Sequence, residues 1–229
     1  MNNRRPFIHC FALCLCFFVP LCLYGQETKT EQFDFPQEGV LHLNNSDGEL
    51  TIQGWDRPDV EITTIKAKHV YLSDDRNAAV LARIQVTTER AGNELVVNTR
   101  FPRYRHFDLE YRIRAPRNAS VVIDHNAGEV NIDNLTGDIR VKIHNGAINL
   151  RLPEENNYSI DAKTGTGSVV SDFPGRWHRR LWPLGQRYEE IKSAPHRLYL
   201  RLGYGDIAIL KIRKPPYALA ADSRQGVIP

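Results

Sequence analysis

Two histidines have the spacing at which acid–base or metal chemistry would be sought, because imidazole titrates near neutral pH and binds metals. His125 and His144 each precede an asparagine. Stacked coils of roughly 18 to 20 residues would bring them to one edge, beside Asp124 or Asp133. However, no two histidines after residue 25 show the i, i+2 or i, i+4 spacing of a metal-binding pair. We expect both to be solvent-facing turn residues and predict no metal site.

A pair of carboxylates is the second candidate, because glycoside cleavage uses two of them on either side of the bond. Glu129 and Asp138 are nine residues apart, each directly after a glycine. Acidic residues are also common at such turn positions simply because they are solvated. A carbohydrate-active enzyme on a β-helix scaffold is therefore the alternative hypothesis, behind a non-enzymatic one.

Other chemistry is excluded by missing motifs. Ser120, Asp124 and His125 lack the nucleophile-elbow motif that presents a catalytic serine. Calcium-binding β-rolls need paired glycines followed by aspartate, whereas the glycines here are single. We predict no catalytic residue and no cofactor.

A basic and aromatic segment suits binding better than catalysis. Residues 176–201 contain seven basic and two acidic side chains, and two of the three tryptophans of the chain lie in this segment. Pro174, Gly175, Pro183 and Gly185 interrupt regular structure, which predicts an exposed loop. The candidate binding residues are Arg176, Trp177, Arg179, Arg180, Trp182 and Arg187.

Two interpretations of this segment stay open. Arginine and tryptophan together suit anionic headgroups, acidic sugars or a partner protein, through charge attraction and stacking. Alternatively the tryptophans cap an open end of the fold, which stacked repeats require, while the arginines are only solvated.

The first 25 residues predict export. Arg4 and Arg5 precede an uncharged apolar run over residues 7–24, and Gly25 offers a small residue at a cleavage point. An uncleaved membrane anchor is the alternative. All four cysteines lie in this segment, so the mature chain would have no disulfide and no thiolate site. The expected location is the periplasm, the cell surface or the medium.

The charge of the mature chain gives no reason to expect nucleic-acid binding. The whole sequence has a net charge of +3, and loss of Arg4 and Arg5 leaves it near +1. A nucleic-acid-binding domain typically carries a large basic excess. The expected partner is instead a protein, an anionic glycan or a membrane surface.

Glycine repeats predict the fold. Gly128, Gly137 and Gly146 are spaced nine residues apart, and each begins a run of glycine, polar, apolar, polar, apolar. Alternation of period two gives a strand one buried and one wet face, and glycine permits the positive φ of a tight turn. Such short units must stack on neighbours to bury their apolar face. The inward-facing residues should be Val130, Ile132, Ile139, Val141, Ile143, Ile148 and Leu150.

The even step favours a right-handed parallel β-helix or β-solenoid, although an ordinary sandwich also has turns, about every 8 to 12 residues. Further strands are predicted over residues 59–68, 95–101 and 109–113, and one short helix over residues 73–82. We expect one domain over residues 26–214 and a loose tail over residues 215–229.

The order of these motifs resembles the bacterial "putative adhesin" family of exported β-strand-repeat proteins, a domain of unknown function. The resemblance implies a right-handed β-helix-like fold, export across the inner membrane, and no established activity. Residues 174–195 depart from the family pattern. The matching motifs are residues 50–56, 84–86, 111–116, 164–169 and 203–207, with the glycine repeats between them. The leading hypothesis is a non-enzymatic envelope or cell-surface protein, an adhesin or binding scaffold.

Overall fold

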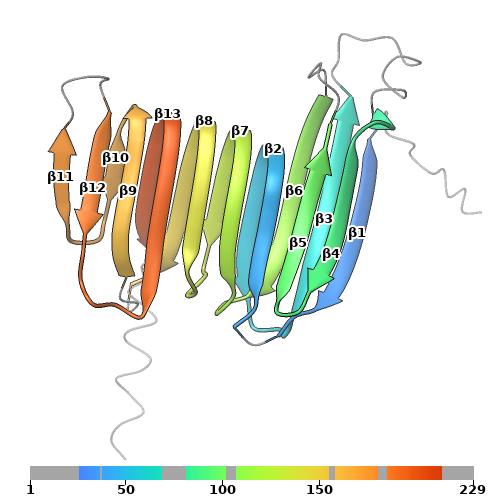
Figure 1. Cartoon of the computed structure of the whole chain (residues 1–229), viewed down its shortest axis with the longest axis horizontal. Helices are drawn as coiled ribbons and strands as arrows, with labels where there is room; N and C mark the ends of the chain where they lie inside the picture. Colours follow the sequence, from blue (N-terminus) through green and yellow to red (C-terminus); the bar gives the residue numbers. More distant parts are fainter. Residues whose placement is uncertain are drawn as a thin grey trace, which may run out of the picture.

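The protein is almost entirely β-sheet. The structure is a computed structural model that describes residues 26–36, 38–68, 81–101, 107–154, 158–179 and 185–212. These residues form one 13-stranded sheet (Figure 1). Its strands are β1 (Glu27–Asp34), β2 (Val40–Trp55), β3 (Asp59–Lys68), β4 (Gln85–Ala91), β5 (Glu94–Arg100), β6 (Phe107–Pro116), β7 (Ser120–Asp133), β8 (Ile139–Pro153), β9 (Tyr158–Thr166), β10 (Val169–Ser171), β11 (Arg176–Arg179), β12 (Gln186–Glu190) and β13 (His196–Ile212).

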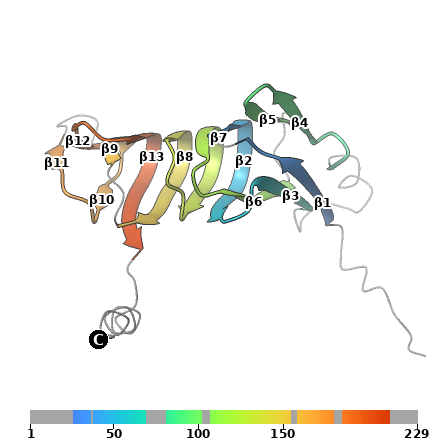
Figure 2. The same ribbon diagram turned by 90° about the horizontal axis from the view of Figure 1, so that it is seen from below.

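Four long strands, β2, β7, β8 and β13, run through two layers (Figure 2). Their N-terminal halves form the first layer together with β5 on one side and β9 on the other. Their C-terminal halves form the second layer together with β6 and β10. The four long strands pair in parallel, whereas the outer strands β1, β3, β4, β11 and β12 pair antiparallel.

A ladder of glycines marks the bend between the layers. Gly48, Gly128, Gly146 and Gly205 pair with one another in register, and each has a positive φ. The backbones approach so closely there that a Cβ on Gly128 would lie 1.9 Å from the Gly48 carbonyl oxygen. Any other residue would meet both the unfavourable φ and this clash. Each strand that bends therefore needs glycine at the same register position.

The core lies between the two layers. Strand β8 stacks on β7 with one constant offset along the chain, so that Val121 pairs with Ile139 and Val130 with Ile148. This register stacks identical faces of successive strands. All seven residues predicted to face inward are buried, with at most 5% of their surface exposed, which confirms the alternation.

The repeat was interpreted wrongly in one respect. The nine-residue units are not successive strands, because Gly128 and Gly146 lie at bends within β7 and β8. Only Gly137 lies between strands. Two units therefore make one bent strand, and the stacking period is twice the step between the glycines.

The predicted strands and the all-β class agree with the structure, whereas other parts of the fold prediction do not agree or lie outside the described residues. The predicted strands over residues 59–68, 95–101 and 109–113 correspond to β3, β5 and β6. The all-β class is confirmed, whereas the right-handed β-helix is not, because the strands form one open sheet. The predicted helix lies outside the described residues except for its last two, as do the predicted signal segment and tail. Within the described residues no helix is long and apolar enough to cross a membrane.

The segment predicted to be an irregular loop contains two strands. β11 pairs antiparallel with β12, and β12 pairs with β9, so the segment extends the edge of the first layer. Proline and glycine lie before and between these strands rather than within them. The prediction missed the strands because they are only four and five residues long.

Candidate functional site

The outer face of the first layer carries rows of basic side chains that cross the strands. In this layer odd and even positions alternate between the core and solvent. The parallel and antiparallel registers then align the solvent-facing residues of β8, β13, β9, β12 and β11. We define the basic row as Lys142, Arg201, Lys163, Arg187 and His178, which are consecutive cross-strand partners.

The glycine trough is a recess beside this row. It is lined by Gly203 and Gly165, which carry no side chain and have no room for one. A Cβ on Gly203 would lie 2.3 Å from the His144 carbonyl oxygen, and one on Gly165 would lie 2.6 Å from that of Gly203. Both glycines line a pocket of about 450 Å³, which is also lined by the cations Lys142, Lys163 and Arg201 and by the carboxylate of Asp124.

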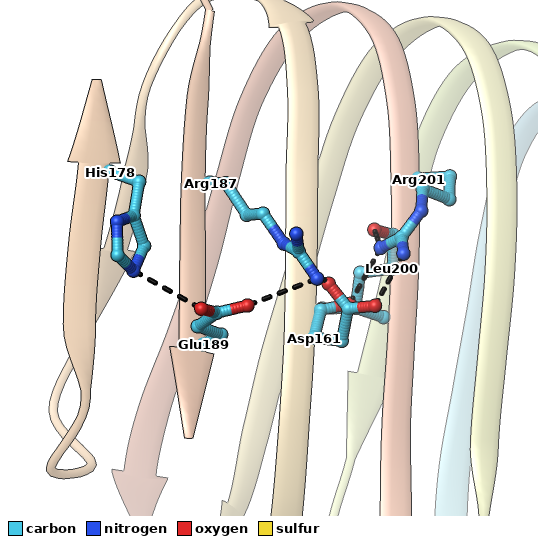
Figure 3. A network of polar contacts seen from close by, with 6 residues as sticks. All are labelled: Asp161, His178, Arg187, Glu189, Leu200 and Arg201. Carbon is cyan, nitrogen blue, oxygen red and sulfur yellow. Dashed lines mark hydrogen bonds and ion pairs between the residues drawn. The ribbon is translucent and has the colours of Figure 1, made fainter. Parts of the chain in front are cut away.

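Asp161 is the centre of the ion-pair network on this face (Figure 3). Arg187 Nε donates to Asp161 Oδ1 at 3.2 Å, and Arg201 binds the other carboxylate oxygen. Arg201 Nη1 also donates to the main-chain oxygen of Asp161 at 2.8 Å. Arg187 continues the chain to Glu189, whose other oxygen lies 3.1 Å from His178 Nε2. The network fixes the two arginines across three strands.

The pKa of Asp161 reflects this environment. Burial by itself would raise the pKa of the carboxyl group. The hydrogen bonds and positive charges of Arg201 and Arg187 outweigh burial and hold the pKa below its usual range. Asp161 is therefore ionised at neutral pH, and it neutralises part of the basic row.

Two lysines of the row are left without such partners. Neither Lys142 nor Lys163 forms an ion pair with any described residue, although Asp124 is the cross-strand neighbour of Lys142. Lys142 is exposed and Lys163 is half-buried. These two ammonium groups lie on either side of Arg201, and within the described part of the chain they are the cations of the row that form no ion pair.

Aromatic rings complete the face. The guanidinium of Arg201 lies 3.9 Å from the ring centroid of Tyr199, and Arg140 stacks on the same ring at 4.8 Å. Tyr204, which is 56% exposed, contacts the ring of His144 edge-on at 5.9 Å. His144 itself lines the pocket, so a ligand there would meet cations beside the imidazole that contacts Tyr204.

The hairpin of β11 and β12 holds the candidate residues from the basic segment. Trp177 stacks on Tyr188 with ring centroids 4.8 Å apart, and its Nε1 donates to the Val169 carbonyl oxygen at 3.1 Å. Gln186 accepts a hydrogen bond from the Val169 amide. Two side chains of the hairpin thus satisfy the backbone of β10, as a cap would, although Trp177 remains 53% exposed.

The remaining candidates of that segment have different positions. Arg176 is exposed at the start of β11, and Arg187 is in the ion-pair network. Arg179 is the last residue of β11. Arg180 and Trp182 lie outside the described residues. Binding by this hairpin therefore stays a prediction.

Both histidines line the pocket beside the basic row, but they are not cross-strand partners of each other. His144 is exposed, as predicted. The prediction for His125 is wrong, because its side chain is buried with 2% of its surface exposed. Its Nδ1 lies 2.8 Å from Ser46 Oγ and its Nε2 lies 3.1 Å from the Gly48 carbonyl oxygen. His125 pairs with Ile143 rather than with His144, so it braces the irregular part of β2 at the bend.

The carboxylate pair and the serine triad are also separated. Glu129 follows the bend in β7 and accepts a hydrogen bond from Asn149. Asp138 precedes β8 at the far end of the first layer, where its amide donates to Ser120 Oγ at 3.3 Å. Asp124 is exposed and His125 is buried, and the imidazole of His125 is bonded to Ser46 and Gly48, although both residues line the pocket beside the basic row. No group of three or more metal-binding side chains is found among the described residues.

The sequence indicates which residues of the basic row face solvent, but it does not indicate which of them lie side by side on neighbouring strands. Arg140 and Lys142 occupy polar positions of the repeat, and Lys163 and Arg201 occupy polar positions of later strands. The registers of β13 with β8 and β9 bridge long sequence separations, which alternation does not predict. His125 is the opposite case, since the buried parity of Val121 and Ile123 already places it inward.

Comparison with known proteins identifies a solved structure of similar fold. No known protein family and no curated protein matches the sequence significantly. A crystal structure from Clostridium sporogenes, named a putative cell adhesion protein, aligns with a TM-score of 0.51. The alignment covers 82% of this chain and 99% of that one at 13% identity. This chain shares that fold.

Weaker similarities carry related names. A putative adhesin from Bacteroides fragilis aligns with a TM-score of 0.28 at 12% identity, covering 81% of this chain and 97% of that one. A putative lipid binding protein from Parabacteroides distasonis aligns with a TM-score of 0.25 at 8% identity, covering 82% and 97%.

Proposed function

We propose that this chain is an exported, non-enzymatic binding protein of the cell envelope or cell surface, of the putative-adhesin kind. It binds its partner with the outer face of the first layer. The single observation that carries the proposal is the regular row of cations along the glycine trough, on a face that is open to solvent.

The arrangement of the sheet supports binding on this face. The apolar side chains of the long strands are used in the core between the layers. The outward-facing positions are then free to vary without loss of the fold, and they carry arginine, lysine and tyrosine. The hairpin of β11 and β12 extends this face to the edge of the sheet, with Arg176 on the same side as His178, whereas Trp177 lies on the opposite side against Tyr188. A right-handed solenoid relationship among the long strands belongs to the same proposal.

The structural neighbour named a cell adhesion protein supports the same class. The alternative is a carbohydrate-active enzyme. It is less favoured because Glu129 and Asp138, the carboxylates expected to act together, lie in different layers and each has a structural hydrogen bond.

Export and surface location are tested by fractionation. The full-length chain with a C-terminal epitope tag is produced in a Gram-negative host, and cytoplasm, periplasm, membranes and medium are probed. Mass spectrometry of the exported form gives its N-terminus. The proposal expects exported protein that begins near Gln26 and labels intact cells or periplasm. Uncleaved protein retained in the cytoplasm would contradict it.

A further inference from the structure

The most specific feature of the face is that its cations and its recess run in the same direction, across the strands. The basic row crosses β8, β13, β9 and β12, and the glycine trough follows it on the side of the bend. Neighbouring strands lie roughly 4.8 Å apart, so one cation recurs at that interval. The partner should be an elongated molecule with repeated negative charges.

We infer that the trough binds an acidic polysaccharide, whose carboxylate or sulfate groups contact Lys142, Arg201 and Lys163. This inference rests on the proposed function and names the partner of the same face. The polysaccharide lies across the strands, with a sugar ring against the exposed ring of Tyr204 at the His144 end of the trough.

The geometry favours a polysaccharide over an extended peptide. A peptide that binds a sheet gains its affinity by pairing with an unpaired strand edge. The trough instead crosses strands β8, β13 and β9, whose main-chain groups are already paired with one another. A ligand there has to be recognised by side chains, through charge, hydroxyl hydrogen bonds and stacking.

The geometry also favours a polysaccharide over a membrane surface. Peripheral binding to a bilayer uses apolar side chains that enter the interface beside the basic ones. Among the described residues, the large exposed apolar side chains other than Tyr204 are Val170, Trp177, Ile191 and Leu210, all away from the trough. The cations of the trough lie beside a recess, which a flat headgroup layer would not fill.

Arg201 and Arg187 are partly neutralised by Asp161, so the two lysines should dominate the attraction. The test variant is Lys142→Gln/Lys163→Gln. The control is Arg90→Gln/Arg100→Gln, which removes two exposed cations from β4 and β5 at the other end of the sheet. Both variants lose the same net charge, so a difference between them reports the site rather than overall electrostatics.

Binding of the mature protein is measured by biolayer interferometry on polygalacturonate, heparin, neutral dextran, polyglutamate and phosphatidylglycerol vesicles. We expect saturable binding to one or both acidic polysaccharides and none to dextran. The lysine variant should bind at least about tenfold more weakly, equivalent to about 1.4 kcal/mol. The arginine control should change affinity less than about twofold, a difference below roughly 0.5 kcal/mol. Each variant should melt within about 4 °C of the wild type, which shows that the fold is kept.

Tighter binding to polyglutamate or to the vesicles, an equal loss in both variants, or no polysaccharide binding at all would overturn the inference. Failure here is distinguishable from failure of the proposed function. An exported protein that labels cells but ignores the polysaccharides leaves the proposed function intact. Protein retained in the cytoplasm contradicts the proposed function whatever the binding result.

Discussion

Gly146 lies against the Gly128 carbonyl oxygen so closely that a Cβ on Gly146 would come within 1.7 Å of it. Gly146 also has a φ of 141°. The substitution Gly146→Ala should therefore force the backbones of β7 and β8 apart at the bend. We expect a loss of at least about 3 kcal/mol in the free energy of unfolding, measured by urea denaturation.

Gly92 provides the matched control for this ladder. It also has a positive φ, of 61°, but nothing lies within 4 Å of a Cβ placed on it. Gly92→Ala should cost only about 1 kcal/mol, the strain of a left-handed residue without a clash. Equal effects of the two substitutions would show that φ alone, and not the close approach, requires glycine at the bend.

The parity of side chains in the fold could be predicted from alternation, because the period of two is a local property. Val130 and Ile148 are buried as expected. The pairing of β13 with both β8 and β9 could not, since it depends on contacts between Leu198 and both Ile139 and Ile160, far apart in the chain. The bend was missed because glycine suits a turn and a mid-strand bend equally well by sequence.

Ile139 tests the buried face directly. It has 1% of its surface exposed, so Ile139→Asp places a charge without a partner in the core. We expect a loss of more than about 3 kcal/mol or an unfolded protein, seen by circular dichroism and thermal melting. The control is Val122→Asp on the outer face, next to Arg140 in the register. If Val122→Asp were the more damaging change, the assignment of the two faces would be wrong.

Asp161 predicts a pH dependence of stability. Its pKa is below the usual value in the folded protein, so its stabilisation is complete above the unfolded pKa and is lost as the pH falls through the folded pKa. Asp161→Asn should lower the free energy of unfolding by about 1 to 2 kcal/mol at pH 7. The difference from wild type should shrink below roughly pH 4, near the unfolded pKa of aspartate.

Asp108→Asn, at an exposed position of β6, is the control for this titration. Urea denaturation from pH 7 down to pH 3 should give nearly parallel stability curves for this variant and the wild type. A constant difference between wild type and Asp161→Asn over the whole range would mean that the pairs with Arg187 and Arg201 do not stabilise the carboxylate.

Trp177 separates the capping and binding interpretations of the hairpin. Trp177→Ala removes both the stack on Tyr188 and the hydrogen bond to Val169. We expect a loss of about 1 to 3 kcal/mol in the free energy of unfolding. The variant Arg176→Ser/Arg179→Ser/Arg180→Ser should stay within about 1 kcal/mol of the wild type. Unchanged retention of that triple variant on anionic liposomes and acidic polysaccharides would assign the hairpin to capping alone.

The candidate site was only partly predictable for physical reasons. Composition placed the excess charge between residues 176 and 201, but Arg187 is engaged by Asp161, a carboxylate outside that window. Lys142 and Lys163 belong to different strands, and the sequence pattern does not indicate that these strands lie close together. Only the register of β13 with β8 and β9 brings them to either side of Arg201.

The proposal that this face binds an acidic chain without cleaving it can be tested directly. The direct measurement incubates the wild-type mature protein with polygalacturonate and follows complex formation and new reducing ends in the same samples, at low and high salt. We expect saturable binding that weakens with salt, because the contacts are between exposed charges, and no increase in reducing ends. Accumulation of reducing ends in proportion to protein concentration, absent from a heat-denatured control, would contradict it.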